Sequence, residues 1–171
     1  MEAVPPGTGT GGVSTTARRE YYDDPDAPAP NSLVVATSAV VTDGQGRILL
    51  QRRADSGNWA LPGGAMEMGE SLTDSVIREV REETGYHIEV TGLVGTYTDP
   101  RHIIAYADGE VRRQFNVCYT ARITAGELAI SSESTELRFV APGELDDLPI
   151  HHTQRLRLRH YLDRDSQPYL G

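Results

Sequence analysis

Residues 64–86 constrain the fold more than any other part of the chain, because they carry a complete set of helix signals. Ser71 is a favourable N-cap, and Asp74 places negative charge in the first turn, where the helix dipole favours it. Gly85 can adopt the left-handed conformation that ends a helix. Apolar residues recur between these signals at every fourth position, at Leu72, Val76 and Val80. The segment therefore predicts one amphipathic helix with a buried stripe.

Strand patterns dominate on both sides of this helix. The predicted strands are residues 33–42, 47–53, 87–98, 111–123 and 137–140. The clearest is 111–123, where apolar residues alternate with polar ones as they do on a sheet with one buried face. Residues 100–109 are predicted as a loop, and a C-terminal helix is predicted around residues 156–162. One strong helix among strands favours a mixed α/β sandwich with helices flanking a sheet.

The carboxylates near the end of the predicted helix form an unfavourable cluster. Glu79, Glu82 and Glu83 stand at i, i+3 and i+4, so they project from one face. Like charges at these spacings destabilise an isolated helix by about 0.2–0.5 kcal/mol per pair, and the helix dipole disfavours anions at this end. A solvated acidic face is one interpretation. The other is a divalent cation such as Mg²⁺ or Mn²⁺, for which carboxylates are suitable hard ligands.

Two further features favour a ligand at this cluster. Arg78 can pair with a neighbouring carboxylate and hold it in position. Gly63 and Gly64 allow the backbone to approach a ligand closely and leave carbonyl groups free to bind a metal ion. The sequence therefore indicates a metal site between the glycine pair and the helix.

The N-terminal region has a different composition from the rest. Residues 1–32 hold four Gly and five Pro and no Leu, Ile or Phe, so they cannot bury enough apolar area to offset the entropy of ordering. We expect a disordered or extended tail over residues 1–32, a folded domain over 33–165 and a short tail over 166–171. The segment 18–22 either docks on the domain or a second subunit, or is a solvated linker.

Charge and composition exclude several classes of protein. The net charge of −9 argues against nucleic-acid binding, which needs a basic surface. No apolar run approaches the ~20 residues of a membrane-spanning helix, so we expect no membrane partner. The single cysteine, Cys118, excludes an internal disulfide framework. The histidines show no metal-ligand spacing with it, and we expect no zinc site. These features favour a cytoplasmic protein.

Residues 64–86 also resemble the signature of the Nudix hydrolases. That signature is Gly, five residues, Glu, seven residues, Arg-Glu, an apolar residue, any residue, Glu-Glu, any residue, Gly and an apolar residue. The matching residues are Gly64, Glu70, Arg78, Glu79, Val80, Glu82, Glu83 and Gly85. Tyr86 departs from the bulky aliphatic residue that is usual, but it can still pack. The likeness extends more loosely over residues 33–162.

The resemblance implies an α/β fold of the Nudix type, an α/β/α sandwich with a mixed sheet. It also implies an enzyme that uses Mg²⁺, or Mn²⁺, to hydrolyse a diphosphate bond in a nucleoside diphosphate derivative. Such substrates include nucleoside triphosphates, ADP-ribose or other nucleotide sugars, and dinucleotide polyphosphates. The alternative is a sensor that binds a nucleotide without turnover, although such proteins usually lose these carboxylates. Family members are often homodimers.

The resemblance also implies roles for individual residues. Glu79, Glu82 and Glu83 would bind the metal, with Glu70 supporting the site and Arg78 orienting the carboxylates. The carbonyl of Gly63 or Gly64 could add a ligand. The candidates for the general base are Glu79, Glu133 and Glu136. Residue type alone adds Arg52, Arg53, Arg101 and Arg113 as candidates for phosphate binding.

Overall fold

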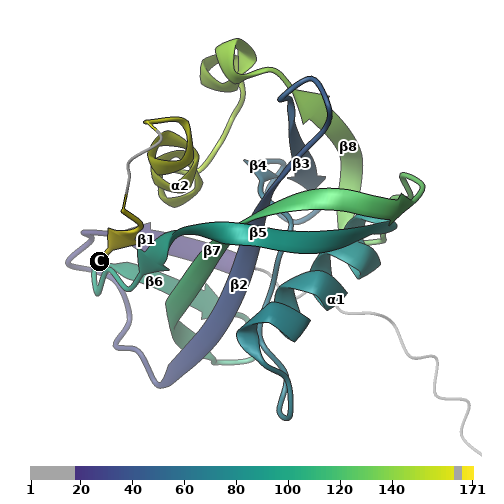
Figure 1. Cartoon of the computed structure of the whole chain (residues 1–171). Coiled ribbons are helices and arrows are strands. Elements are labelled where there is room, and N and C mark those ends of the chain that lie inside the picture. Colours follow the sequence, from purple (N-terminus) through teal and green to yellow (C-terminus); the bar gives the residue numbers. More distant parts are fainter. Residues whose placement is uncertain (1–17, 164–166) are drawn as a thin grey trace, which may run out of the picture.

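The computed structural model describes residues 18–163 and 167–171, which form one nine-stranded mixed sheet with helices packed against it (Figure 1). The strands are β1 (Arg18–Tyr22), β2 (Ser32–Thr42), β3 (Ile48–Arg53), β4 (Trp59–Ala60), β5 (Tyr86–Tyr97), β6 (His102–Tyr106), β7 (Val111–Gly126), β8 (Ser134–Val140) and β9 (Tyr169–Leu170). The helices are α1 (Leu72–Thr84), the 3₁₀ helix η1 (Pro142–Asp147) and α2 (His152–Asp163).

The central path of the sheet runs in the order β1-β6-β7-β2-β3-β4. Strands β2 and β7 are parallel along their whole overlap, from Ser32 opposite Arg112 to Thr42 opposite Arg122. β5 and β6 are antiparallel to β7, and β8 is antiparallel to β3. The mixed sheet that the sequence predicted is therefore confirmed.

The two faces of β2 carry two different hydrophobic cores. Ala39 and Val41 pack on Val76 and Val80 of α1, whereas Val40 belongs to the core that includes Leu158 of α2. Because neighbouring side chains of a strand point to opposite faces, α1 and α2 cover opposite sides of the sheet. This arrangement is the predicted α/β/α sandwich.

The predicted helix signals all function in α1. The Ser71 hydroxyl accepts a hydrogen bond from the Asp74 N–H at 3.1 Å. Gly85 has φ 78° and its N–H donates to the Arg81 carbonyl at 2.9 Å. The helix is therefore held at both ends by residues that the sequence identified.

Two predictions around the edge of the sheet need correction or completion. The predicted loop over 100–109 is wrong, because residues 102–106 form β6. Segment 18–22 docks on the domain as β1, antiparallel to β6, with Arg18 opposite Tyr106 and Tyr22 opposite His102. Each strand supplies the other's hydrogen-bonding partners, a non-local effect that neither short segment reveals alone. The sheet thus includes residues upstream of Leu33, while the predicted disorder of residues 1–17 lies outside the described residues.

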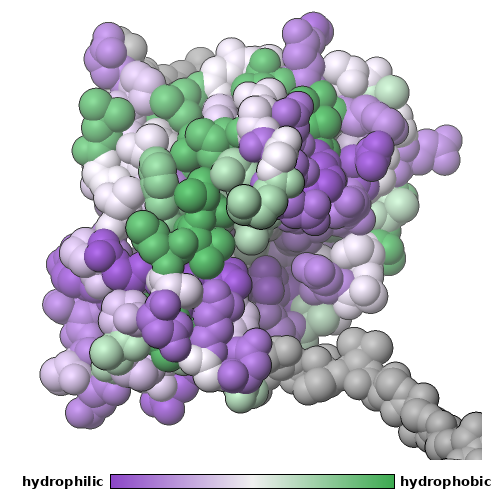
Figure 2. Space-filling model, turned by 90° about the horizontal axis from the view of Figure 1, so that it is seen from below, coloured by the Kyte–Doolittle hydropathy of each residue, from purple (hydrophilic) through white to green (hydrophobic). Residues whose placement is uncertain are grey.

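The surface combines polar and apolar areas. Figure 2 shows hydrophobic residues gathered in one area of the face seen there, beside large hydrophilic areas. Among residues 18–163 and 167–171, no helix is long and apolar enough to cross a membrane. The predicted homodimer stays a prediction.

Candidate active site

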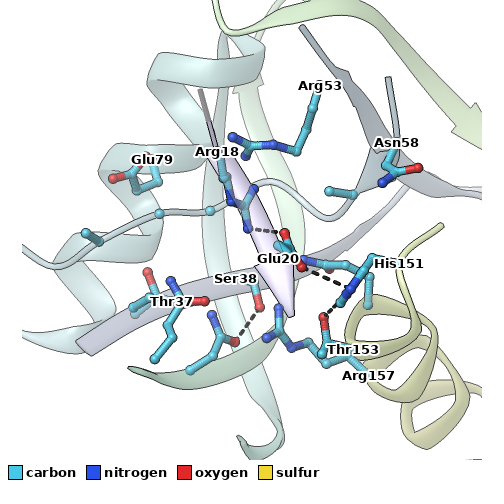
Figure 3. A pocket seen from close by; sticks show the side chains of 18 of the residues that line it. Arg18, Glu20, Thr37, Ser38, Arg53, Asn58, Glu79, His151, Thr153 and Arg157 are labelled. Atoms are coloured by element: carbon cyan, nitrogen blue, oxygen red, sulfur yellow. Dashed lines mark hydrogen bonds and ion pairs between the residues drawn. The ribbon is translucent and has the colours of Figure 1, made fainter. Parts of the chain in front are cut away.

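A polar cleft of about 260 Å³ lies where the predicted metal-binding helix faces the N-terminal strand and the start of α2 (Figure 3). Glu79 and Glu83 of α1 line it together with the loop residues Gly63 and Gly64. The cleft therefore contains four of the residues that the sequence assigned to a metal site.

Both glycines are required by close contacts in this loop. The Gly63 N–H donates to Glu83 Oε2 at 2.7 Å. Gly63 has φ 145°, and a Cβ there would lie 2.2 Å from the Thr37 carbonyl oxygen. A Cβ on Gly64 would lie 2.6 Å from the Glu79 carboxyl group. The absence of a side chain on Gly64 therefore lets the Glu79 carboxylate approach the loop, and its absence on Gly63 lets the loop pack against the backbone of β2.

Arg78 organises the carboxylates around it. Its Nε donates to Glu70 Oε1 at 2.5 Å, and one terminal nitrogen donates to Glu70 Oε2 at 3.0 Å. The other terminal nitrogen donates to Glu79 Oε1 at 2.9 Å and to Glu82 Oε2 at 3.1 Å. A further bond to the Ala65 carbonyl at 3.1 Å fixes the guanidinium on the loop. Hydrogen bonding from Arg78 lowers the pKa of Glu70, so Glu70 is a fixed anionic partner of Arg78.

The two cleft carboxylates of α1 are destabilised as anions. Burial raises the pKa of Glu83 to about 7, although hydrogen bonds from Gln51 and Gly63 oppose this, and the charges of Glu79 and Glu133 raise it further. Burial also raises the pKa of Glu79, against the effect of Arg78. Buried negative charge with too little positive charge nearby favours a bound cation.

The remaining predicted carboxylates occupy different environments. Glu82 has a side chain that is 53% exposed and points to Arg78 at the rim of the site. Glu133 lines the cleft. Glu136 is exposed, lies opposite Arg52 in the pairing of β8 with β3, and does not line the cleft. Of the three general-base candidates, Glu79 and Glu133 therefore lie at the cleft.

One of the four predicted phosphate-binding arginines reaches this cleft. Arg53 lines it and also donates to Asp55 at 2.6 Å. Arg52 does not, because it is exposed and follows the buried Gln51 in β3, where successive side chains alternate in direction. Its Nε donates to the Gly57 carbonyl instead, at 3.2 Å.

The other two arginines are directed elsewhere by the same kind of local geometry. On β7, Arg112 and Gln114 line the cleft, so Arg113 between them points to the opposite face. Arg101 pairs with Asp99 at 2.7 Å and lines a second cavity beside Tyr22. The structure does not bring Arg101 or Arg113 to the cleft.

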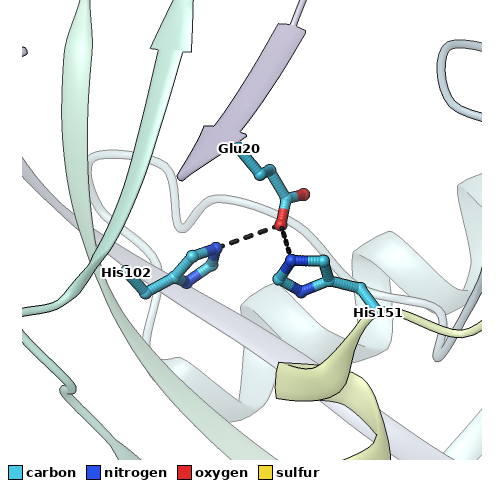
Figure 4. Close-up of side chains that lie close together, drawn as sticks. All are labelled: Glu20, His102 and His151. Carbon is cyan, nitrogen blue, oxygen red and sulfur yellow. Dashed lines mark hydrogen bonds and ion pairs between the residues drawn. The ribbon is translucent and has the colours of Figure 1, made fainter. Parts of the chain in front are cut away.

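The far end of the cleft contains side chains that sequence reasoning missed (Figure 4). Glu20 Oε2 of β1 accepts a hydrogen bond from His102 Nε2 at 3.1 Å. The same oxygen lies 3.0 Å from His151 Nε2, within ion-pair distance. Its other oxygen pairs with Arg18. Burial would raise the pKa of Glu20, but hydrogen bonding from His102 and the charge of Arg18 lower it to about 2.

These three groups also have the spacing of a metal site. The ligand atoms of Glu20, His102 and His151 all lie within 4.8 Å of one another. The ion pair between Glu20 and Arg18 already compensates the carboxylate, so the local charge does not favour a cation. The only sequence signal here was the alternation of Arg18 and Glu20, which places both side chains on one face of a strand.

The family model described as the NUDIX domain matches residues 32–161, which include both helix α1 and the glycine loop before it. The chain belongs to the Nudix family. The predicted resemblance is therefore confirmed, and this Nudix protein is a hydrolase by family.

Several relatives support the same assignment. A MutT-like protein of Streptomyces ambofaciens is 36% identical over 129 residues, covering 74% of this chain and 77% of the relative. An ADP-ribose pyrophosphatase of Methanocaldococcus jannaschii is 31% identical over 131 residues, covering 70% and 71%. A putative 8-oxo-dGTP diphosphatase of Bacillus subtilis is 33% identical over 107 residues, covering 62% of this chain and 65% of the relative.

Solved structures share the fold. A NUDIX hydrolase from Nitrosomonas europaea matches with a TM-score of 0.66 and 24% identity, covering 81% of this chain and 77% of that one. A MutT NUDIX hydrolase from Burkholderia pseudomallei matches with a TM-score of 0.60 and 29% identity, covering 76% and 98%.

Proposed function

We propose that this Nudix hydrolase cleaves a diphosphate bond in a nucleoside diphosphate derivative, with Mg²⁺ as its cofactor and Mn²⁺ as a substitute. The observation that carries the proposal is the pair of carboxylates of buried Glu83 and half-buried Glu79, held against a glycine loop in a polar cleft. Their raised pKa values signal uncompensated negative charge, which a divalent cation would offset.

The residues present fit such an ion. Glu79, Glu82 and Glu83 supply hard oxygen donors, which Mg²⁺ prefers. The carbonyl of Gly63 or Gly64 is the proposed backbone ligand. The Gly64 carbonyl accepts a hydrogen bond from the Thr37 N–H at 2.8 Å and keeps a second lone pair.

The chemistry divides between the metal and the protein. When bound, the ion offsets the charge that develops on the phosphate oxygens and polarises the bond to be cleaved. Glu79 or Glu133 accepts a proton from the attacking water, since both line the cleft. Arg53 contacts substrate phosphate, and Arg78 keeps Glu79 in position through its 2.9 Å hydrogen bond.

The names of the relatives indicate a class of substrate and not a single compound. One is named for ADP-ribose and another for 8-oxo-dGTP, and both compounds contain a nucleoside diphosphate unit. We therefore propose the class as a whole. The cytoplasmic location also stays a proposal, based on the single cysteine.

The test is a substrate panel with the purified full chain. ADP-ribose, 8-oxo-dGTP, the normal dNTPs and a dinucleotide polyphosphate are incubated with Mg²⁺, and products are separated by chromatography. We expect at least one compound to be hydrolysed, and turnover to be lost when Glu79, Glu82 and Glu83 are all replaced by Gln. Glu67→Gln is the matched control, because Glu67 is an exposed acid in the same segment. Tight binding with no product from any compound would favour the sensor instead.

A further inference from the structure

Arg157 is a buried cation with no polar partner among the residues that the structure describes. It lies on α2 and is 4% exposed. Across the part of the chain that the structure describes, no hydrogen bond or ion pair to its guanidinium is present, and its buried Nε has no partner. Its guanidinium carbon lies 5.4 Å from the centroid of the Tyr97 ring. A cation–π contact offsets only part of the cost of burying a charge.

The same helix shows how a partly buried arginine is normally satisfied. Arg155 donates to the Leu148 carbonyl at 2.7 Å, to the Ile150 carbonyl at 3.2 Å and to the Leu145 carbonyl at 3.3 Å. These carbonyls lie just before α2, so Arg155 has a structural role. Arg157 has no such contacts, so folding alone does not explain it.

The position of Arg157 indicates a ligand. Its side chain extends from α2 into the cleft, and Glu79 of α1 lies at the other end of the same cleft (Figure 3). Asn116 lies beside this end of the cleft, and its Oδ1 accepts a hydrogen bond from the Ser38 hydroxyl at 2.8 Å. Its amide nitrogen has no acceptor among the described residues, so it can donate to a ligand as well.

We propose that Arg157 binds an oxyanion of the substrate, such as a phosphate group, at the end of the cleft opposite the carboxylates of α1. A guanidinium binds phosphate oxygens through two parallel hydrogen bonds. The proposal rests on the proposed function, because a nucleoside diphosphate derivative carries more than one anionic group. The cleft then has an acidic end for the metal and a basic end for a phosphate.

The electrostatics of this end support an anion over a second metal ion. Arg18 also lines the cleft here, and its charge is already paired with Glu20. Arg157 therefore supplies one net positive charge, and no carboxylate among the residues that the structure describes contacts it. A cation bound between Glu20 and the histidines would be repelled by both arginines.

The test uses inorganic pyrophosphate with the full chain in EDTA at constant ionic strength. Without a metal ion the carboxylates of α1 repel the probe, so binding reports on the basic end. We expect calorimetry to detect pyrophosphate binding by the wild type and at least a tenfold higher Kd for Arg157→Met. Arg159→Met is the matched control, because Arg159 is an exposed arginine on the same helix, and its Kd should equal that of the wild type.

Stability and a second variant keep the result interpretable. Arg157→Met should have a Tm equal to or above that of the wild type without ligand, because it removes an unpaired buried charge. If Arg157→Met does not fold, Arg157→Lys is used in its place. A lysine keeps the positive charge but cannot form two parallel hydrogen bonds to a phosphate, so the Kd of Arg157→Lys should still be higher than that of the wild type. Equal Kd values for the wild type and the Arg157 variants, or no pyrophosphate binding by the wild type, would overturn the proposal. Pyrophosphate binding through Arg157 in a chain that hydrolyses no compound of the panel would instead refute only the proposed function.

Discussion

Replacing Glu83 with Gln should make the metal-free protein more stable at alkaline pH while abolishing hydrolysis. Glu83 is nearly fully buried, and burial raises its pKa from the ordinary 4.5 to about 7. A group whose pKa is raised on folding contributes stability below its unfolded pKa, and this contribution is lost as pH rises through its folded pKa. The ionised form therefore destabilises the fold above pH 7.

The magnitude follows from the two pKa values. Because each pKa unit corresponds to about 1.4 kcal/mol, ionisation of Glu83 costs up to about 3 kcal/mol when the difference between 4.5 and 7 is fully realised. At pH 5 a small part of this cost is already present, since the unfolded carboxyl is mostly ionised there. The advantage of Glu83→Gln should thus grow by about 2–3 kcal/mol between pH 5 and pH 8.5.

Urea unfolding in EDTA at both pH values measures this change. Any effect of the glutamine side chain that does not depend on pH is the same at both pH values and cancels when the two stability differences are subtracted. Glu82→Gln is the control, because the Glu82 side chain is 53% exposed and surface substitutions usually change stability by less than about 0.5 kcal/mol. The stability of Glu83→Gln relative to the wild type should therefore change between pH 5 and pH 8.5. If it is the same at both pH values, the ionised Glu83 does not destabilise the metal-free fold, and the argument is refuted.

Two further predictions concern the loop glycine and the histidine end of the cleft. Gly64→Ala should lower kcat by about tenfold to a hundredfold, because its Cβ would lie 2.6 Å from the Glu79 carboxyl. Gly44→Ala is the control and should leave kcat unchanged in the same assay, because its added Cβ has no atom within 4 Å. Equal activity of the two variants would contradict this reasoning. Burial lowers the pKa of His151 to about 4, so the wild type should lose stability as pH falls from about 6.5 to 4, where the unfolded histidine binds a proton and the folded one does not. In urea unfolding His151→Gln should lose less over this range than the exposed control His87→Gln, and parallel curves for the two variants would count against the prediction.

The sequence predicted the parts of the fold that depend on local pattern. The strand over 33–42 was readable from its run of apolar residues, and β2 forms there. The strand β6 was not, because His102–Tyr106 is short and gains its partners from β1 and β7. Strand pairing over such separations depends on the whole sheet and not on the five residues themselves.

The candidate site divides in the same way. Sequence spacing identifies Glu79, Glu83 and Gly64, and these residues line the cleft together. Residue type alone suggests Arg52 and Arg113, but the alternation of side chains in β3 and β7 directs them away from the cleft. Residue type states which contacts a side chain can make, whereas strand direction decides where it makes them.

By itself the sequence determined helix α1, its two caps and the single face shared by its carboxylates, because helix geometry fixes the relation between residues three and four positions apart. Only the tertiary structure decided that β1, β6 and α2 meet at the other end of the cleft. There Glu20 lies between His102 and His151, and the Nε of buried Arg157 has no partner within residues 18–163 and 167–171. No local rule relates these residues, because their proximity results from the register of β1 on β6 and from the packing of α2 on one hydrophobic core.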